Sequence, residues 1–200
     1  MRILNLFAGI GGNRTLWGDS HDITAVEFDP AIAAIYQQRF PTDMVVVGDA
    51  YEYLEQHFDE FEFIWASPPC TTHSKLNLFA QNIRLPDLRV YSIIIFLDRW
   101  HKGKWAVENV KPYYQPLIPI TRDLGRHFFW ANFYIPAHRF PQPQGTLKDL
   151  ALPKLKDWHG ITEDVTRQQL RNCVDCRSGK FILDRAIKPK QTRLFQEGGA

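Results

Sequence analysis

The chain has 200 residues, of which 44% are hydrophobic and 23% are charged. A chain of this length and composition closes around one hydrophobic core, which excludes wholesale disorder and two large independent folds. No apolar run approaches the ~18 residues of a membrane span, and the run at 3–10 is too short and too glycine-rich for a signal peptide. Three cysteines cannot form a disulfide framework, so we expect the cytoplasm of a bacterial, archaeal or phage-infected cell.

Charge is distributed unevenly along the chain. Residues 1–100 contain 7 Lys and Arg against 13 Asp and Glu, whereas residues 101–200 contain 17 against 9. The two halves therefore carry net charges of −6 and +8. A basic half suggests a surface that faces a polyanion, although a solvated basic face explains the charge equally well.

Strand-like and helix-like patterns alternate through the first half of the chain. The expected strands cover residues 2–7, 23–27, 44–47, 61–66 and 105–110. The expected helices cover residues 30–40, 51–58 and 85–100, with a short helix ending at Trp17. Five strand–helix repeats predict an α/β fold, a Rossmann-like, doubly wound and mostly parallel sheet that binds its ligand at the carboxyl ends of the strands.

The second half of the chain is rich in proline and does not continue the strand–helix alternation. Repeated prolines between Pro112 and Pro153 predict extended connections rather than helices, with one strand over 126–134. Closing helices are expected over 163–171 and 179–187, the first capped by Asp164 or Thr162. The extended stretch could hold a small recognition element.

Three successive strand ends carry residues suited to a nucleoside. The first strand enters the glycine-rich turn 7–12, where backbone N–H groups can approach a ligand closely. Glu27 ends the second strand and could accept hydrogen bonds from ribose hydroxyls, and Asp49 follows the third strand and could accept one from an adenine amino group. Each acid alone is typical of a surface carboxylate or helix cap, but together they favour a nucleoside cofactor.

The next two strand ends carry reactive groups. Cys70 follows Pro68 and Pro69 at the end of the fourth strand, where a thiol is a candidate nucleophile rather than a buried filler. Glu108 ends the fifth strand directly after an apolar run, so desolvation would raise its pKa and suit it to acid–base work. A structural carboxylate is the alternative interpretation of Glu108.

In their order along the chain, these residues resemble the DNA cytosine-5 methyltransferases. The resemblance rests on the turn 7–12, Glu27, Asp49, the Pro69-Cys70 pair and the run 108–110, which reads Glu-Asn-Val. It is dense over residues 1–112. The later segment 170–174 is similar to the family's Gly-Asn-Ser-Val segment, with Arg171 in place of the usual glycine.

The resemblance implies S-adenosylmethionine as methyl donor, held in a fold typical of methyltransferases that use it. The cofactor residues that it implies are Phe7, Ala8, Gly9, Ile10, Gly11, Gly12, Glu27, Phe28, Asp49, Ala50, Pro69 and Asn172. In this interpretation Phe7 and Phe28 flank the adenine and Asn172 closes the pocket. No metal is implied.

The resemblance also implies the chemistry. Cys70 adds to C6 of cytosine, which activates C5 toward the methyl group, while Glu108 holds N3 and the exocyclic amine. Because C6 is unreachable in a stacked duplex, the DNA must present a flipped-out cytosine, and the basic second half would hold the flanking phosphates.

The match weakens after residue 112. The family has a pair of arginines ahead of the next strand, and here only Arg126 is carried over as a catalytic residue; a phosphate-facing arginine is the alternative. We expect a catalytic core at 1–133, a reduced target-recognition segment at 134–169, and a C-terminal segment at 170–200 that returns to the core. The short recognition segment implies a short target sequence or help from a partner protein.

Four further features favour ordinary structural interpretations. Cys173 and Cys176 have metal-ligand spacing but lack a second pair, so zinc is not expected. His73 and His127 could assist proton movement, although lone histidines are more often structural. The aromatic run 128–130 is typical of strand core, and the basic tail 188–193 is typical of a solvated end that touches phosphate.

Three alternatives to DNA cytosine-5 methylation stay open. One branch of the same family modifies transfer RNA, and a divergent relative could transfer an altered group to C5. A non-catalytic nucleic-acid-binding subunit is the third, although the presence of both Cys70 and Glu108 disfavours it. The sequence leaves open the biological role, whether restriction protection, phage modification or regulation.

Overall fold

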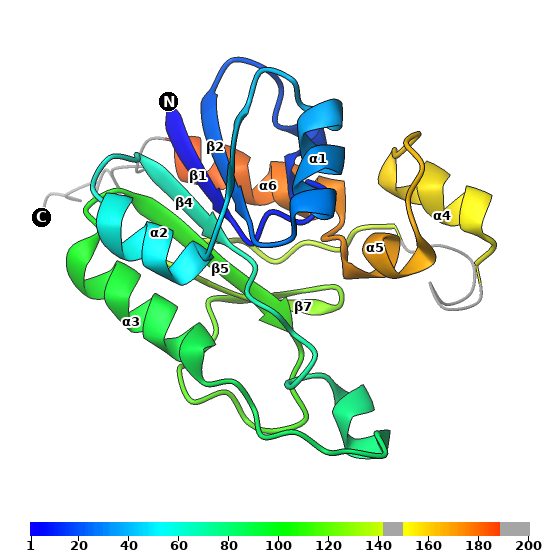
Figure 1. Ribbon diagram of the computed structural model, residues 1–200. Helices are drawn as coiled ribbons and strands as arrows, with labels where there is room; N and C mark the ends of the chain where they lie inside the picture. Colours follow the sequence, from blue (N-terminus) through cyan, green and yellow to red (C-terminus); the bar gives the residue numbers. More distant parts are fainter. Residues whose placement is uncertain (142–149, 189–200) are drawn as a thin grey trace, which may run out of the picture.

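The computed structural model describes residues 1–141 and 150–188, and in them the strands form one sheet (Figure 1). Its order is β3-β2-β1-β4-β5-β7-β6. The strands are β1 (Arg2–Leu6), β2 (Asp22–Glu27), β3 (Met44–Val47), β4 (Phe63–Ala66), β5 (Lys104–Val110), β6 (Arg122–Leu124) and β7 (His127–Ala131). Strands β1 to β5 are parallel, and β7 is antiparallel to both β5 and β6. The predicted Rossmann-like, mostly parallel sheet is therefore confirmed.

Helices cover both faces of the sheet (Figure 1). They are α1 (Pro30–Arg39), α2 (Ala50–His57), α3 (Arg89–Trp100), α4 (Leu152–His159), α5 (Arg167–Asn172) and α6 (Cys176–Ile187), with short 3₁₀ helices η1 (Asn13–Leu16) and η2 (Lys75–Phe79). Among the described residues, none of these helices combines the length and the apolar character needed to cross a bilayer.

Alternation along the strands divides the core into two layers. Leu4 and Leu6 point to one face, where they join a cluster that includes Leu97 of α3. Ile3 points to the other face and joins Ile182 of α6. Because side chains alternate with a period of two, a single strand supplies both layers and each face is covered by helices.

Aspartates start the helices that leave the working edge of the sheet. The side chain of Asp29 accepts hydrogen bonds from two backbone N–H groups of the first turn of α1, whose first residue is Pro30. Asp49 caps α2 in the same way. These caps fix where β2 and β3 end, and so where the residues after them can reach.

Several boundaries in the second half differ from the sequence-based expectation. The prolines did not exclude a helix, because Pro153 lies in the first turn of α4, where its missing N–H costs nothing. The three-residue β6 is too short to produce a periodic pattern. Helix α5 is capped by Thr166, which forms a capping box with Gln169, so the caps expected at Asp164 or Thr162 were wrong.

The remaining differences are shifts of a few residues. The strand expected over 126–134 is the shorter β7, α3 begins at Arg89, and α6 begins at Cys176 with Asp175 as its cap. Residues 142–149 of the expected recognition segment and 189–193 of the basic tail lie outside the described residues.

Candidate active site

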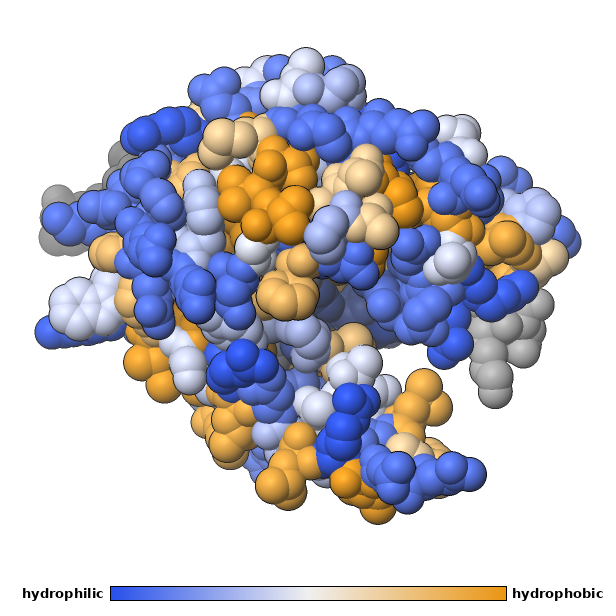
Figure 2. Space-filling model, in the orientation of Figure 1, coloured by the Kyte–Doolittle hydropathy of each residue, from blue (hydrophilic) through white to orange (hydrophobic). Residues whose placement is uncertain are grey.

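The site lies where the strand order of the sheet reverses. Chain connections run from β1 toward β3 on one side and from β4 toward β6 on the other, so the loops after β1 and β4 diverge and leave a crevice between them. A pocket of about 520 Å³ occupies this place, within the range of small-molecule sites. In the space-filling view, a recess opens near the middle of this face, largely rimmed by hydrophilic residues (Figure 2).

The glycine-rich turn forms one wall of the pocket. Phe7 and Gly9 both have φ of 55°, and a Cβ placed on Gly9 would meet no atom within 4 Å, so the turn leaves open space beside its backbone. Gly11 has another task. A Cβ there would lie 2.4 Å from Cε2 of Phe40, so this glycine allows close packing with the end of α1 and does not line the pocket.

Glu27 connects the end of β2 to this turn. Its Oε2 accepts a hydrogen bond of 2.8 Å from the Gly9 N–H, and its Oε1 accepts one of 3.0 Å from the Asp29 N–H. Two backbone donors therefore hold the carboxylate at the pocket wall. Each oxygen can still accept a further hydrogen bond from a ligand.

Asp49 lies on the same side of the pocket. Its Oδ1 accepts hydrogen bonds from the N–H groups of Tyr51 at 2.7 Å and Glu52 at 3.4 Å, so it is a helix cap as well as a lining residue. Its Oδ2 has no hydrogen-bond partner within residues 1–141 and 150–188. Phe28, which is 74% exposed, also lines the pocket.

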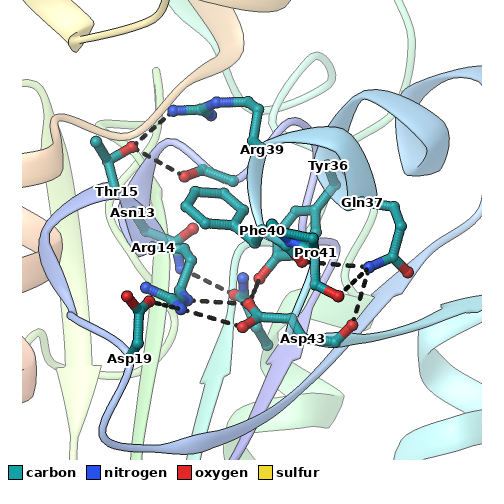
Figure 3. Close-up of polar contacts among 12 residues, drawn as sticks. Asn13, Arg14, Thr15, Asp19, Tyr36, Gln37, Arg39, Phe40, Pro41 and Asp43 are labelled. Carbon is teal, nitrogen blue, oxygen red and sulfur yellow. Dashed lines mark hydrogen bonds and ion pairs between the residues drawn. The ribbon is translucent and has the colours of Figure 1, made fainter.

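A buried polar network lies beneath the turn (Figure 3). Arg14 donates to both carboxylate oxygens of Asp43 at 2.9 and 3.0 Å, and the Tyr36 hydroxyl donates to Asp43 Oδ2 at 2.9 Å. The Arg14 and Asp43 side chains are each only 2% exposed. Burial and the Asp43 carboxylate raise the pKa of Tyr36 far above its ordinary value. The network ties the helix η1, which follows the turn, to α1 and the segment before β3.

Arg39 of α1 extends this support to the turn itself. It donates to the Ile10 carbonyl and to the Thr15 hydroxyl, and Figure 3 draws the contact with Thr15 above the network. Its guanidinium also pairs with Glu163 at 3.3 Å. Arg39 thus links the glycine-rich turn to the segment that precedes α5.

Cys70 lies on the opposite wall, after the two prolines that follow β4. Its side chain is partly exposed and lines the pocket. Burial, together with the charge of Glu108, raises the pKa of the thiol to about 11, while the nearby Arg126 charge lowers it. Asn109 donates to the Pro68 carbonyl at 2.9 Å and so ties this loop to the end of β5. At neutral pH the thiol is protonated, so a reaction through Cys70 requires its deprotonation.

Glu108 lies on the pocket floor and is only 5% exposed. Burial raises the pKa of its carboxyl group to about 7, against the opposing effects of a Ser67 hydrogen bond and the Arg126 charge. His127 Nε2 lies 3.4 Å from Glu108 Oε1. A carboxyl group with this pKa can give or take a proton near neutrality.

Arg126 and Asn172 complete the predicted set. Both line the pocket, Arg126 from the turn before β7 and Asn172 from the end of α5. Within the described ranges, the Arg126 side chain makes no hydrogen bond or ion pair, although its charge acts on both Cys70 and Glu108. Asn172 Oδ1 accepts a hydrogen bond from Gln168 at 2.9 Å.

The structure gathers the predicted site residues around one pocket, with Gly11 as the exception. Those that line it are Phe7, Ala8, Gly9, Ile10, Gly12, Glu27, Phe28, Asp49, Ala50, Pro69, Cys70, Glu108, Arg126 and Asn172.

Several other lining residues were not in the predicted set, among them Ser67, Tyr51 and Arg89. Ser67 hydrogen-bonds Glu108, and Tyr51 lies under the guanidinium of Arg89, 4.5 Å from its ring centroid. Ser67 directly precedes the two prolines and could have been found as part of that loop. Tyr51 and Arg89 lie in the first turns of α2 and α3, so nothing in the local sequence signals their place in the pocket.

Residues 1–78 match the family described as C-5 cytosine-specific DNA methylase. The resemblance stated from the motifs is therefore confirmed over these residues, and methyltransferase is the class of enzyme that they indicate. The matched segment holds the glycine-rich turn, Glu27, Asp49 and Cys70, whereas Glu108, Arg126 and Asn172 lie beyond it. Comparison with curated protein sequences found no match.

Similar solved structures include a conserved hypothetical protein of Streptococcus pyogenes, with 16% identity, 70% of this chain and 90% of that chain covered, and a TM-score of 0.46. A hypothetical protein of Thermus thermophilus has 19% identity, with 65% of this chain and 73% of that chain covered and a TM-score of 0.46. A SAM-dependent methyltransferase of Agrobacterium tumefaciens has 10% identity, with 57% of this chain and 40% of that chain covered and a TM-score of 0.44. All three TM-scores are below 0.5, so the fold assignment rests on the strand order of the sheet itself.

Proposed function

We propose that this protein is a DNA cytosine-5 methyltransferase that uses S-adenosylmethionine. One observation supports this most strongly. A thiol and a carboxyl group from the adjacent strands β4 and β5 share one pocket with the acids that follow β2 and β3. The family match over residues 1–78 agrees with this chemistry.

The wall formed by β1, β2 and β3 suits the donor. S-adenosylmethionine supplies an electrophilic methyl group on a sulfonium centre. The open space beside Gly9 would accept part of the nucleoside, and Glu27 would accept hydrogen bonds from the ribose hydroxyls. The unpartnered Oδ2 of Asp49 would accept one from the adenine amino group, with Phe28 against the ring.

The wall formed by β4 and β5 suits the base. The Cys70 thiol would lose its proton to a base, and its sulfur would bond to C6 of cytosine. The ring electrons displaced toward C5 would then attack the methyl group, whose bond to the sulfonium sulfur breaks and leaves a neutral thioether. A base then removes the C5 proton, and the sulfur–C6 bond breaks to regenerate the thiolate. Glu108 would hold N3 and the exocyclic amine, and Arg126 would offset negative charge that develops on the ring.

The proposed substrate is duplex DNA with one cytosine turned out of the stack. A base inside a duplex cannot bring C6 within bonding distance of a pocket-bound thiol, so the base must enter the pocket. The net charge of +8 on residues 101–200 would favour the flanking phosphates. Residues 134–169 would form a reduced recognition segment between the core and the C-terminal segment, with a partner protein completing recognition if the segment is insufficient.

Methyl transfer to defined nucleic acids tests the proposal. The protein is incubated with methyl-labelled S-adenosylmethionine and either duplex DNA or transfer RNA, and the product nucleosides are identified by mass. The expected result is 5-methylcytosine in the DNA, with none from a Cys70→Ser variant that binds the donor normally. Label only in the RNA, a different added mass, or equal activity of Cys70→Ser would each contradict the proposal.

A further inference from the structure

His127 and Glu108 form a buried polar pair on the pocket floor. The 3.4 Å contact joins His127 Nε2 to Glu108 Oε1, and the two residues are 9% and 5% exposed. The pairing of β5 with β7 explains it. Val110 lies opposite His127 and Glu108 lies opposite Phe129, so His127 and Glu108 are diagonal neighbours on adjacent strands. The register of the sheet therefore fixes this contact.

The imidazole in this pair is uncharged. Burial and the charges of Arg126 and Lys111 lower the pKa of His127 to about 3, against the opposing charge of Asp175. The contact is therefore between a neutral ring and a carboxyl group rather than an ion pair. The 3.4 Å separation is long for a hydrogen bond, and a neutral imidazole that carries its hydrogen on Nε2 would direct this donor toward Glu108 Oε1.

Ser67 is a second donor to the same carboxyl group. Trp65 Nε1 donates to Ser67 Oγ at 2.6 Å, which leaves the hydroxyl hydrogen of Ser67 for Glu108. Ser67 follows β4 and His127 begins β7, so the two donors come from the strands on either side of β5.

We propose that His127 is a positioning residue for Glu108, an inference that rests on the proposed function. Its Nε2–H holds Oε1 so that the carboxyl proton faces N3 of the extruded cytosine. When the Cys70 sulfur bonds to C6, the proton passes from Glu108 to N3, and the carboxylate left behind is stabilised by Ser67 and His127. The proton returns to Glu108 when the sulfur leaves C6, so the cycle balances.

Titration of Glu108 in the free protein tests this directly. Carbon-13 NMR of labelled Glu side chains is followed against pH, with Glu108→Gln to assign the signal. Because a hydrogen bond to a charged group is lost, His127→Leu is expected to raise the Glu108 midpoint by about one pH unit. His127→Gln, which keeps a donor, should return it toward the wild-type value. His101→Leu is the matched control, because His101 is equally buried but does not line the pocket.

An unchanged midpoint in a folded His127→Leu protein would overturn the proposal. If that variant does not fold, the wild-type protein provides the test. Above the Glu108 midpoint, the imidazole nitrogen-15 shifts of His127 should report the Nε2–H tautomer. The Nδ1–H tautomer would contradict the proposal. In single turnovers, the alkaline limb of the methyl-transfer profile should move with the midpoint. Absence of methyl transfer on every substrate would overturn the proposed function. The titration of Glu108 would still test its contact with His127 in that case.

Discussion

Two clusters of ionisable side chains in the protein differ in the partners that these side chains have. Beneath the glycine-rich turn, Arg14 and Asp43 make two hydrogen bonds to each other and Tyr36 adds a third, so the buried charges are paired (Figure 3). On the pocket floor, Cys70 and Glu108 lie together with no cation hydrogen-bonded to either among the described residues, and both pKa values are raised. Paired buried charges fix a structure, whereas under-partnered ones are suited to exchange protons with a ligand.

The largest expected effect is on activity, and it distinguishes the pocket residues from the network beneath the turn. Cys70→Ser should lower the rate of methyl transfer on the order of 10³-fold or more, because a serine hydroxyl is a far weaker nucleophile than a thiolate. The free energy of unfolding should change little, since the side chain is partly exposed and Ser is of similar size. Single-turnover kinetics and urea unfolding measure the two quantities. A variant with normal rate, or one that fails to fold, would contradict the contrast.

The opposite pattern is expected beneath the turn. Asp43→Ala should lower the free energy of unfolding by about 3–5 kcal/mol, because it leaves the Arg14 guanidinium buried without its carboxylate. The matched control is Asp184→Ala, which removes an exposed pair with Lys180 and should cost less than about 0.5 kcal/mol. Urea unfolding compares the two, and equal losses would show that the buried network is not special.

Glu108 should make stability depend on pH. Its folded pKa of about 7 lies above the ordinary 4.5, so its contribution to stability is fully present below about pH 4.5 and is lost as the pH rises through 7. Glu108→Gln removes this dependence. Relative to the wild type, the variant should therefore gain up to about 3 kcal/mol between pH 4.5 and 7. Parallel stability curves for the two proteins would contradict a raised pKa.

The smallest expected effect concerns the donor wall. Asp49→Asn should keep α2 stable, because Asn is as good an N-cap as Asp. It should weaken binding of S-adenosylmethionine by about tenfold, since the charged acceptor Oδ2 is replaced. Calorimetric titration gives the affinity and thermal unfolding gives the stability. Unchanged affinity would mean that Asp49 is a helix cap only.

The first half of the fold was predictable because its signals are local. Each strand from β1 to β5 is a short apolar run, and Pro30 marks the start of α1. Since parallel strands end at one edge, residues after those strands could be predicted to meet. The second half was harder, because β6 has three residues and the first turn of α4 contains a proline that resembles a helix breaker.

The sequence predicted which residues line the pocket but not the contacts between them. Cys70 and Glu108 follow strand signals, so their meeting at the pocket follows from strand order. The contact of His127 with Glu108 depends on the antiparallel register of β7 with β5, which no local pattern specifies. Gly11 fell in the same motif as Gly9, yet only its packing against Phe40 reveals that it serves the turn's support rather than the pocket.

Covalent trapping tests the central claim most directly. The protein is incubated with S-adenosylmethionine and duplex DNA containing 5-fluorocytosine, in which fluorine replaces the C5 hydrogen and blocks the final elimination. The account predicts a stable protein–DNA adduct that maps to Cys70 by peptide mass, contains one added methyl group, and is absent with Cys70→Ser. No adduct under conditions where the protein binds both donor and DNA, or an adduct at another residue, would contradict it.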